Sequence, residues 1–136
     1  MSLMFSSNQI VERNVGLTYD DVLLMPRHCE ITSRTIPDLK TRLTKNTKMD
    51  IPFIAANMDT VTEVEMALKM GKLGGHAILH RFMSIEDHVK MVQKLRELKE
   101  KNPSLVLSAS VGVKEEGMKR ADALVAAGIE IITLDI

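Results

Sequence analysis

Polar side chains that could take part in chemistry stand directly behind short apolar runs of this chain. Four such groups occur, and they are Asn57-Met58-Asp59, His80-Arg81, Ser110-Val111-Gly112 and Asp135. An arginine in this position offers a rigid fork of N–H donors that matches a phosphate group. An ionised carboxylate at the end of an apolar run is costly unless it meets water, a donor or a ligand hydroxyl. Arg81 is therefore a candidate phosphate contact, and Asp135 is a candidate ligand contact.

The same groups also have structural interpretations. Met58 could fill the core, and Asp59 could cap the next helix, because a carboxylate near a helix N-terminus meets free N–H groups and a favourable dipole. For His80, a hydrogen-bonded structural role is favoured over catalysis. The histidines show no metal-ligand spacing with one another, and neither a nucleophile elbow nor a phosphate-binding loop with a lysine occurs. The sequence therefore predicts no metal site in this stretch.

The apolar runs in front of these groups predict four strands. The runs cover residues 51–56, 77–79, 105–109 and 129–134. Short and almost wholly apolar runs are typical of parallel strands that are buried on both faces.

Capping residues and hydrophobic spacing predict three helices between these strands. Residues 62–65 have the pattern of a capping box, residues 84–87 open a second helix, and a third is expected over about residues 114–127. The residues expected to end the helices are Gly74, Asn102-Pro103 and Gly128. The side chains expected to face the core are Met66, Leu68, Met70 and Leu73, then Val89, Val92, Leu95 and Leu98, and finally Met118, Ala121, Leu124 and Val125.

Strands that alternate with helices indicate a parallel sheet with right-handed crossovers. An open doubly wound sheet and a (β/α)8 barrel both fit this pattern. The turn after the first strand, at residues 57–61, has no glycine-rich phosphate loop, which disfavours a dinucleotide-binding sheet. We therefore predict an α/β fold with an N-terminal arm at residues 1–50. Residues 51–136 then supply roughly the first four strands and three helices of a parallel (β/α)8 TIM barrel.

The length of the chain bears on this prediction. A whole barrel needs about 250 residues, whereas this chain has 136. Because an isolated half would leave two sheet edges open, we expect the chain to be part of a longer protein. In a barrel the functional residues gather at the C-terminal ends of the strands, and the four polar groups are predicted to lie there.

Composition narrows the class of protein. Hydrophobic residues make up 45% and charged residues 26% of the chain, as is usual for a globular domain. The formal net charge is zero, so no basic field attracts nucleic acid. No apolar run approaches the roughly 20 residues of a membrane span, and no signal-peptide pattern opens the chain. Cys29, the single cysteine, is interpreted as structurally incidental, and a cytoplasmic location is expected.

Five segments, in order along the chain, make the sequence similar to the IMP dehydrogenase/GMP reductase family. They are Leu17–Pro26, Ile54–Val61, Leu79–Ser84, Ser108–Val113 and Thr133–Ile136. The resemblance implies a (β/α)8 barrel, usually a homotetramer, that holds a purine nucleotide (GMP or IMP) beside NADP or NAD. It also implies a catalytic cysteine on a later loop, whose motif Cys29 does not match. This stretch should therefore carry no catalytic residue and be inactive alone, and a K+ site would also lie outside it.

The resemblance also assigns binding residues. It places Met58 and Asn57 against the purine base. The residues that it places near the nicotinamide cofactor are Ser33, Arg34, Arg81, Asp135 and Ile136. The first two reach the cofactor from the arm, and that cofactor could be held by a neighbouring subunit.

Within the family, the resemblance favours GMP reductase, which uses NADPH to convert GMP to IMP with loss of ammonia. Only residues 101–104 join the second helix to the third strand, so the regulatory insertion of paired cystathionine-synthase-type (CBS) modules is absent there. The residues Ala56-Asn57-Met58 and Ser33-Arg34 also resemble the reductase.

IMP dehydrogenase, which oxidises IMP to XMP with NAD, stays open as the alternative. Residues 43–46 and 83–86 resemble the dehydrogenase, and Val111 stands where some reductases have a hydroxyl residue that helps ammonia to leave. Two further classes also stay open. A stand-alone half-barrel that serves as a binding or assembly module predicts a soluble dimer of this chain. A different phosphate-handling barrel enzyme predicts no matching cysteine loop elsewhere.

Overall fold

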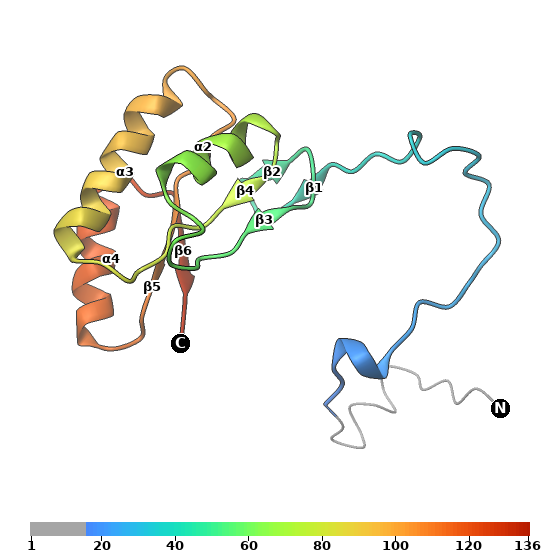
Figure 1. Ribbon diagram of the computed structural model, residues 1–136, viewed down its shortest axis with the longest axis horizontal. Helices are drawn as coiled ribbons and strands as arrows, with labels where there is room; N and C mark the ends of the chain where they lie inside the picture. The colour runs from blue at the N-terminus through green and yellow to red at the C-terminus, as the bar shows by residue number, and fades with distance from the viewer. Residues whose placement is uncertain (1–15) are drawn as a thin grey trace. The chain divides into compact units, whose positions relative to one another are not determined.

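The computed structural model describes residues 16–136 (Figure 1). These residues belong to two units, and the boundary in the sequence lies between Pro37 and Asp38. The first unit contains one short 3-10 helix, η1 (Tyr19–Asp21). The Asp21 carboxylate accepts hydrogen bonds from the backbone N–H of Thr18 at 2.8 Å and from its hydroxyl at 2.9 Å. Leu23 and Leu24 of this unit are almost fully exposed.

The second unit begins with a hairpin that the sequence did not predict. Strands β1 (Thr41–Arg42) and β2 (Lys48–Met49) pair antiparallel. The turn between them is closed by the Leu43 N–H, which donates to the Thr47 carbonyl at 2.9 Å. Strands of two residues are too short to show an alternating hydrophobic pattern, so they could not be predicted from hydrophobic spacing.

Four parallel strands follow, and they are β3 (Ile54–Ala55), β4 (His76–Ala77), β5 (Ser108–Val111) and β6 (Ile131–Leu134). β3 pairs with β4, and β5 pairs with β6. A parallel bridge between Leu79 and Ala109 joins the two pairs. Neighbours in space are thus neighbours in sequence, whereas a doubly wound sheet reverses its strand order at a switch point. The predicted α/β fold with parallel strands is confirmed.

Two details of the strand prediction are wrong. The third strand begins at Ser108 and not at residue 105, because Leu105 instead packs on Gly71 of a helix before the strand starts. In addition, β3 and β6 are not buried on both faces, since Ile54 is 43% and Leu134 is 70% exposed. These two strands each pair with a parallel neighbour on one side only within the described residues.

Three helices connect the parallel strands: α2 (Val64–Lys72), α3 (Ile85–Lys99) and α4 (Glu115–Ala127). α3 packs against both α2 and α4, so the three form one layer (Figure 1). None of the helices in residues 16–136 has the length and apolarity needed to cross a membrane.

Most helix boundaries match the predictions. The Ser84 hydroxyl accepts from the Asp87 N–H at 3.0 Å and caps α3 as expected. Gly74 and Gly128 follow α2 and α4 with φ angles of 78° and 96°, in the left-handed region that favours glycine. The predicted capping box at Thr62 is wrong. α2 begins after Glu63, and the buried Thr62 hydroxyl donates instead to the Ala56 carbonyl at 2.5 Å.

The predicted inward face of α4 is confirmed in part, since Leu124 is buried and Ala121 packs against the core. Met118 and Val125 are 64% and 59% exposed, whereas Gly117, Arg120, Leu124 and Ala127 are buried. The inward face includes Gly117 because α4 turns a glycine, and not a larger side chain, toward the loop after β5. In α2, Leu68 and Met70 pack against the core as predicted, and Ala67 and Gly71 are buried as well. Met66 and Leu73, which were also predicted to face inward, are exposed.

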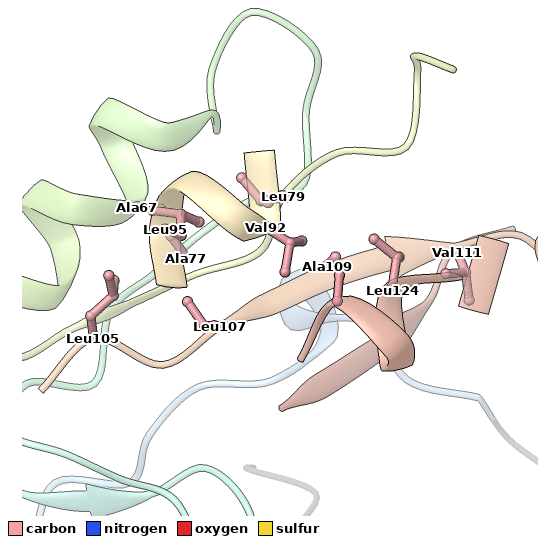
Figure 2. Packing of buried hydrophobic residues seen from close by; sticks show 11 residues of the cluster. Ala67, Ala77, Leu79, Val92, Leu95, Leu105, Leu107, Ala109, Val111 and Leu124 are labelled. Atoms are coloured by element: carbon pink, nitrogen blue, oxygen red, sulfur yellow. The ribbon is translucent and has the colours of Figure 1, made fainter. Parts of the chain in front are cut away.

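The hydrophobic core lies between the helix layer and the strands (Figure 2). Its fully buried members include Leu79 next to β4, Val92 of α3, Ala109 of β5 and Leu124 of α4, each with no exposed surface. Each helix and each central strand contributes to the same cluster. The C-terminal ends of the strands are therefore held by one continuous packing unit.

Candidate functional site

The polar groups predicted from the sequence lie behind the C-terminal ends of the parallel strands. Met58 follows β3, Arg81 follows the bridge residue Leu79 beyond β4, Gly112 follows β5 and Asp135 follows β6. The Asp135 N–H donates to the Val111 carbonyl at 2.9 Å, which ties the end of β6 to that of β5. Because the strands are parallel, these ends form a single rim.

Arg81 and Asp135 form an ion pair on this rim. The Arg81 Nε donates to Asp135 Oδ2 at 2.8 Å, although the two residues are 54 positions apart in the sequence. The side chains are 30% and 26% exposed, so the pair is partly open to solvent. β5 lies between their strands, and a Cβ added to Gly112 would lie 3.6 Å from Arg81 Nη1. The guanidinium therefore spans the end of β5 above Gly112.

The Arg81 guanidinium also lies against an aromatic ring. Its Cζ is 5.1 Å from the centroid of the Phe82 ring, within the range of a cation–π contact. Phe82 is 58% exposed, so the ring beside the guanidinium is open to solvent. Nε faces Asp135, and among the described residues no bond to the two terminal nitrogens of Arg81 is formed. The fork thus keeps donors for an anion.

His80 is a buried histidine at the same rim, as its structural interpretation expected. Its Nδ1 accepts from the Phe82 N–H at 3.2 Å, so Nε2 carries the proton of the neutral ring. Nε2 faces Asp59 Oδ1 at 3.7 Å and Glu63 Oε1 at 3.6 Å, which is too long for hydrogen bonds. The predicted cap by Asp59 is wrong, since Glu63 occupies the N-cap position of α2.

Met58 is displayed by a loop whose backbone is well tied. The Met58 N–H donates to the Ala56 carbonyl at 2.8 Å, and the Met58 carbonyl accepts from Thr62 N–H at 3.1 Å. The side chain itself is 58% exposed, so Met58 is not core filler within the described unit. Asn57 next to it is half-buried. Together these residues offer a fixed, partly apolar edge beside the rim.

Three predicted residues remain, and they are Ile136, Ser33 and Arg34. Ile136 is 99% exposed. Ser33 and Arg34 belong to the first unit, where the Ser33 hydroxyl lies 2.9 Å from the Thr35 hydroxyl and both side chains are exposed. Within the second unit, the structure brings Arg81 and Asp135 together.

Sequence reasoning missed a second cluster directly behind the rim, formed by Arg120, Glu116 and His88. Arg120 of α4 is only 5% exposed, and its Nη1 lies 3.2 Å from His88 Nδ1 of α3. Burial, followed by the positive charge of Arg120, lowers the pKa of His88 to about 4. The signal was present in the sequence, because Arg120 stands at helical spacing with the buried Gly117 and Leu124.

Other candidate sites are weaker. A groove of about 790 Å³ runs between α2 and α3 and is lined by Met66, Met91 and the three lysines Lys69, Lys90 and Lys94. It does not include Arg81 or Asp135. No group of three histidine, cysteine, aspartate or glutamate side chains within residues 16–136 is placed to hold a metal ion.

Comparison with known proteins supplies a context for this rim. The model of the IMP dehydrogenase / GMP reductase domain matches residues 16–136. An IMP dehydrogenase of Nitrosopumilus maritimus is 49% identical over 86 residues, or 63% of this chain and 18% of that protein. A GMP reductase of Leishmania donovani is 43% identical over 98 residues, or 70% of this chain and 20% of that protein. The chain thus spans about a fifth of the length of these two relatives.

Proposed function

The chain belongs to the IMP dehydrogenase / GMP reductase family, and on this premise we propose that the whole protein is a purine nucleotide oxidoreductase. Relatives with both enzyme names match the chain, so the class of substrate follows from either name. The observation that carries the proposal is the Arg81–Asp135 pair, which stands half-open on the rim that also bears Met58.

The proposed fold of the whole protein is a closed (β/α)8 barrel. Consecutive strands are neighbours, and the helices form one layer, as a barrel requires. Further strands would extend the sheet from β3 and β6, whose exposed side chains such as Leu134 would then become buried.

The rim suits a nicotinamide cofactor, which would supply the hydride donor or acceptor when bound. The open N–H groups of Arg81 can bind a phosphate oxygen, and the Asp135 carboxylate can accept from a ribose hydroxyl. The flat face of Phe82 beside the guanidinium can stack on a planar ring. We assign Arg81, Asp135 and the neighbouring Ile136 to cofactor binding, together with Ser33 and Arg34 of the first unit.

The purine nucleotide is assigned to the edge formed by Asn57 and Met58. The exposed thioether of Met58 is polarisable and suits the face or edge of a purine ring. The fixed backbone of residues 56–62 would hold this side chain in place while the base binds.

GMP reductase is the proposed reaction, with NADPH as the reductant and IMP as the product. The connection from α3 to β5 is direct: Asn102 Nδ2 donates to the Leu98 carbonyl at 2.8 Å and closes the helix, and the chain then enters β5 at Ser108. No regulatory insertion interrupts the chain at this point.

IMP dehydrogenase is the second candidate, and Val111 favours it. This side chain is 2% exposed in β5 and carries no hydroxyl that could assist the loss of ammonia. A relative with this name is also 49% identical to the chain over the matched region.

Two assays on the full-length protein separate these reactions. Oxidation of NADPH in the presence of GMP would identify the reductase, and reduction of NAD in the presence of IMP would identify the dehydrogenase. Turnover in neither assay, with well-folded protein, would reject the proposed function. We also propose a homotetramer, for which the molar mass of the full-length protein in solution is the test.

A further inference from the structure

We propose that Arg120 is a positioning residue that fixes the turn after β4 and thereby sets the orientation of Arg81 on the rim. The proposal rests on the proposed function, because Arg81 is assigned there to the nicotinamide cofactor. Arg120 does not itself lie on the rim, and it acts through the backbone of residues 81–84. The inference adds a residue of α4 to a site built from strand ends.

The guanidinium of Arg120 bridges from α4 to the turn that carries Arg81. Its Nη2 donates to the Met83 carbonyl at 2.8 Å, and its Nη1 donates to the Ser84 carbonyl at 3.4 Å. Ser84 is the N-cap of α3, so one side chain holds both the end of the turn and the start of the helix. Two successive carbonyls are contacted by the two prongs of one planar fork, which only arginine offers.

The other donors of Arg120 are also engaged. Glu116 Oε1 accepts from Nε at 3.1 Å and from Nη2 at 2.6 Å, and this carboxylate balances the buried charge. His88 Nδ1 lies 3.2 Å from Nη1 and must act as the acceptor, because a guanidinium has no lone pair to offer. Every nitrogen of the fork therefore has a partner, and the side chain is held in one place.

The turn transmits this constraint to Arg81. The Met83 N–H donates to the Arg81 carbonyl at 2.9 Å, and the Phe82 N–H donates to His80 Nδ1 at 3.2 Å. With both ends of the turn bonded, a displacement of Met83 must move Arg81. The distance of 2.8 Å between Arg81 Nε and Asp135 Oδ2 would then change as well.

α4 also holds the floor beneath the Arg81 guanidinium. Gly117 lies so close to Gly112 that a Cβ on Gly117 would overlap the Gly112 carbonyl. Gly112 in turn lies under Arg81 Nη1. α4 thus positions the turn through Arg120 and the backbone at Gly112 through Gly117. Both contacts fix the position of Arg81 relative to Gly112.

The test compares variants of the full-length protein in steady-state kinetics. Arg120→Met removes the fork but keeps an unbranched side chain, and Arg120→Lys keeps the charge with a single donor group. Lys119→Met is the matched control, since Lys119 is the neighbouring residue on the exposed side of α4. Arg120→Met should raise the KM for the nicotinamide cofactor about 10- to 100-fold, because misplacement of a binding group by about 1 Å costs up to that much.

The KM for the purine nucleotide, unlike the KM for the cofactor, should hardly change. It should stay within about twofold of wild type in Arg120→Met, because Met58 lies on a separate loop tied by its own hydrogen bonds. Arg120→Lys should fall between wild type and Arg120→Met, and Lys119→Met should match wild type. An equal rise of both KM values would indicate general unfolding and overturn the proposal, as would an unchanged KM for the cofactor.

A second readout does not depend on activity. Amide hydrogen exchange of the peptide that spans residues 82–88 should be faster in Arg120→Met than in Lys119→Met, with residues 54–62 unchanged. If exchange at residues 82–88 is unchanged, the positioning role is wrong. If the wild-type enzyme has no turnover with either nucleotide, the proposed function is wrong, but faster exchange would still show that Arg120 holds the turn.

Discussion

Two arginines stand on either side of the turn after β4, and they are used in opposite ways. Arg81 is 30% exposed and engages Asp135 through Nε, while Arg120 is 5% exposed and engages partners through all of its nitrogens. The fork of Arg81 keeps capacity for a ligand. The fork of Arg120 is satisfied by two backbone carbonyls, a carboxylate and a neutral histidine. An arginine that is partly exposed is thus available to bind a ligand, whereas an arginine that is buried with all its nitrogens bonded holds neighbouring backbone in position.

Removing each guanidinium in turn is the most direct test of the difference between Arg81 and Arg120. Arg120→Met should lower the free energy of unfolding of the full-length protein by about 3–5 kcal/mol, because buried carbonyls and Glu116 lose their partner. Arg81→Met should lower it by less than about 1 kcal/mol, because the pair with Asp135 is partly solvated. Chemical denaturation followed by circular dichroism gives both values. Equal losses of unfolding free energy in the two variants would mean that Arg120 contributes no more to stability than Arg81.

Acid should weaken the closed cluster, which consists of Arg120, Glu116 and His88. Burial and then the charge of Arg120 lower the pKa of His88 to about 4, with smaller effects of His80 and Glu116. Because the unfolded chain takes up a proton near pH 6.5, this contribution to stability is complete above pH 6.5 and is lost as the pH falls toward 4. The loss amounts to about 3 kcal/mol for His88.

The control for this effect is His88→Gln, whose stability should depend less steeply on pH between 6.5 and 4. Some dependence should persist, since burial also lowers the pKa of His76. Unfolding free energies measured at several pH values decide the matter. Identical pH profiles for wild type and His88→Gln would contradict the neutral, buried state of His88.

The two glycines between the arginines offer a further contrast. Gly117→Ala should cost about 2 kcal/mol of stability, since the new methyl group would overlap the Gly112 backbone and overpacking of this kind costs 1–3 kcal/mol. Gly112→Ala should cost less than about 1 kcal/mol, because the new Cβ would lie 3.6 Å from Arg81, which is ordinary contact. Both variants add the same methyl group, so thermal unfolding of the two tests the expected difference in stability.

A smaller effect is expected at the N-cap of α3, where the Ser84 carbonyl also accepts from Arg120. Ser84→Ala removes the bond from the Asp87 N–H and should cost about 1 kcal/mol. In the background of Arg120→Met the same substitution should cost less, because the turn is already loosened and neighbouring effects are not additive. A double-mutant cycle measures this coupling. Full additivity would show that Arg120 and the cap of α3 act independently.

Much of the local structure could be predicted from the sequence. The cap at Ser84 and the stops at Gly74 and Gly128 were predicted correctly, because each depends on the side chain of one residue and the backbone next to it. The order of strands and helices was predicted as well, from hydrophobic spacing. The box at Thr62 failed for a tertiary reason, since its hydroxyl finds a better acceptor at Ala56, outside the helix.

The candidate site was predictable in its positions but not in its contacts. Alternation of strands and helices already placed Met58, Arg81 and Asp135 behind strand ends, on one rim. Which side chains meet there depends on how far each strand extends and on which residue of α4 faces inward. The prediction turned Met118 and Val125 inward, whereas Gly117 and Arg120 are buried, and Arg120 was therefore missed.

The sequence by itself determined the type and order of the elements and the end of the sheet at which polar residues gather, because these depend on local propensity and on the direction of parallel strands. Only the tertiary structure decided that Arg81 meets Asp135 across Gly112 and that Arg120 closes on the turn behind them. Such contacts join residues tens of positions apart, and their geometry is set by the packing of α4 on β5 and α3 rather than by any neighbour in the chain.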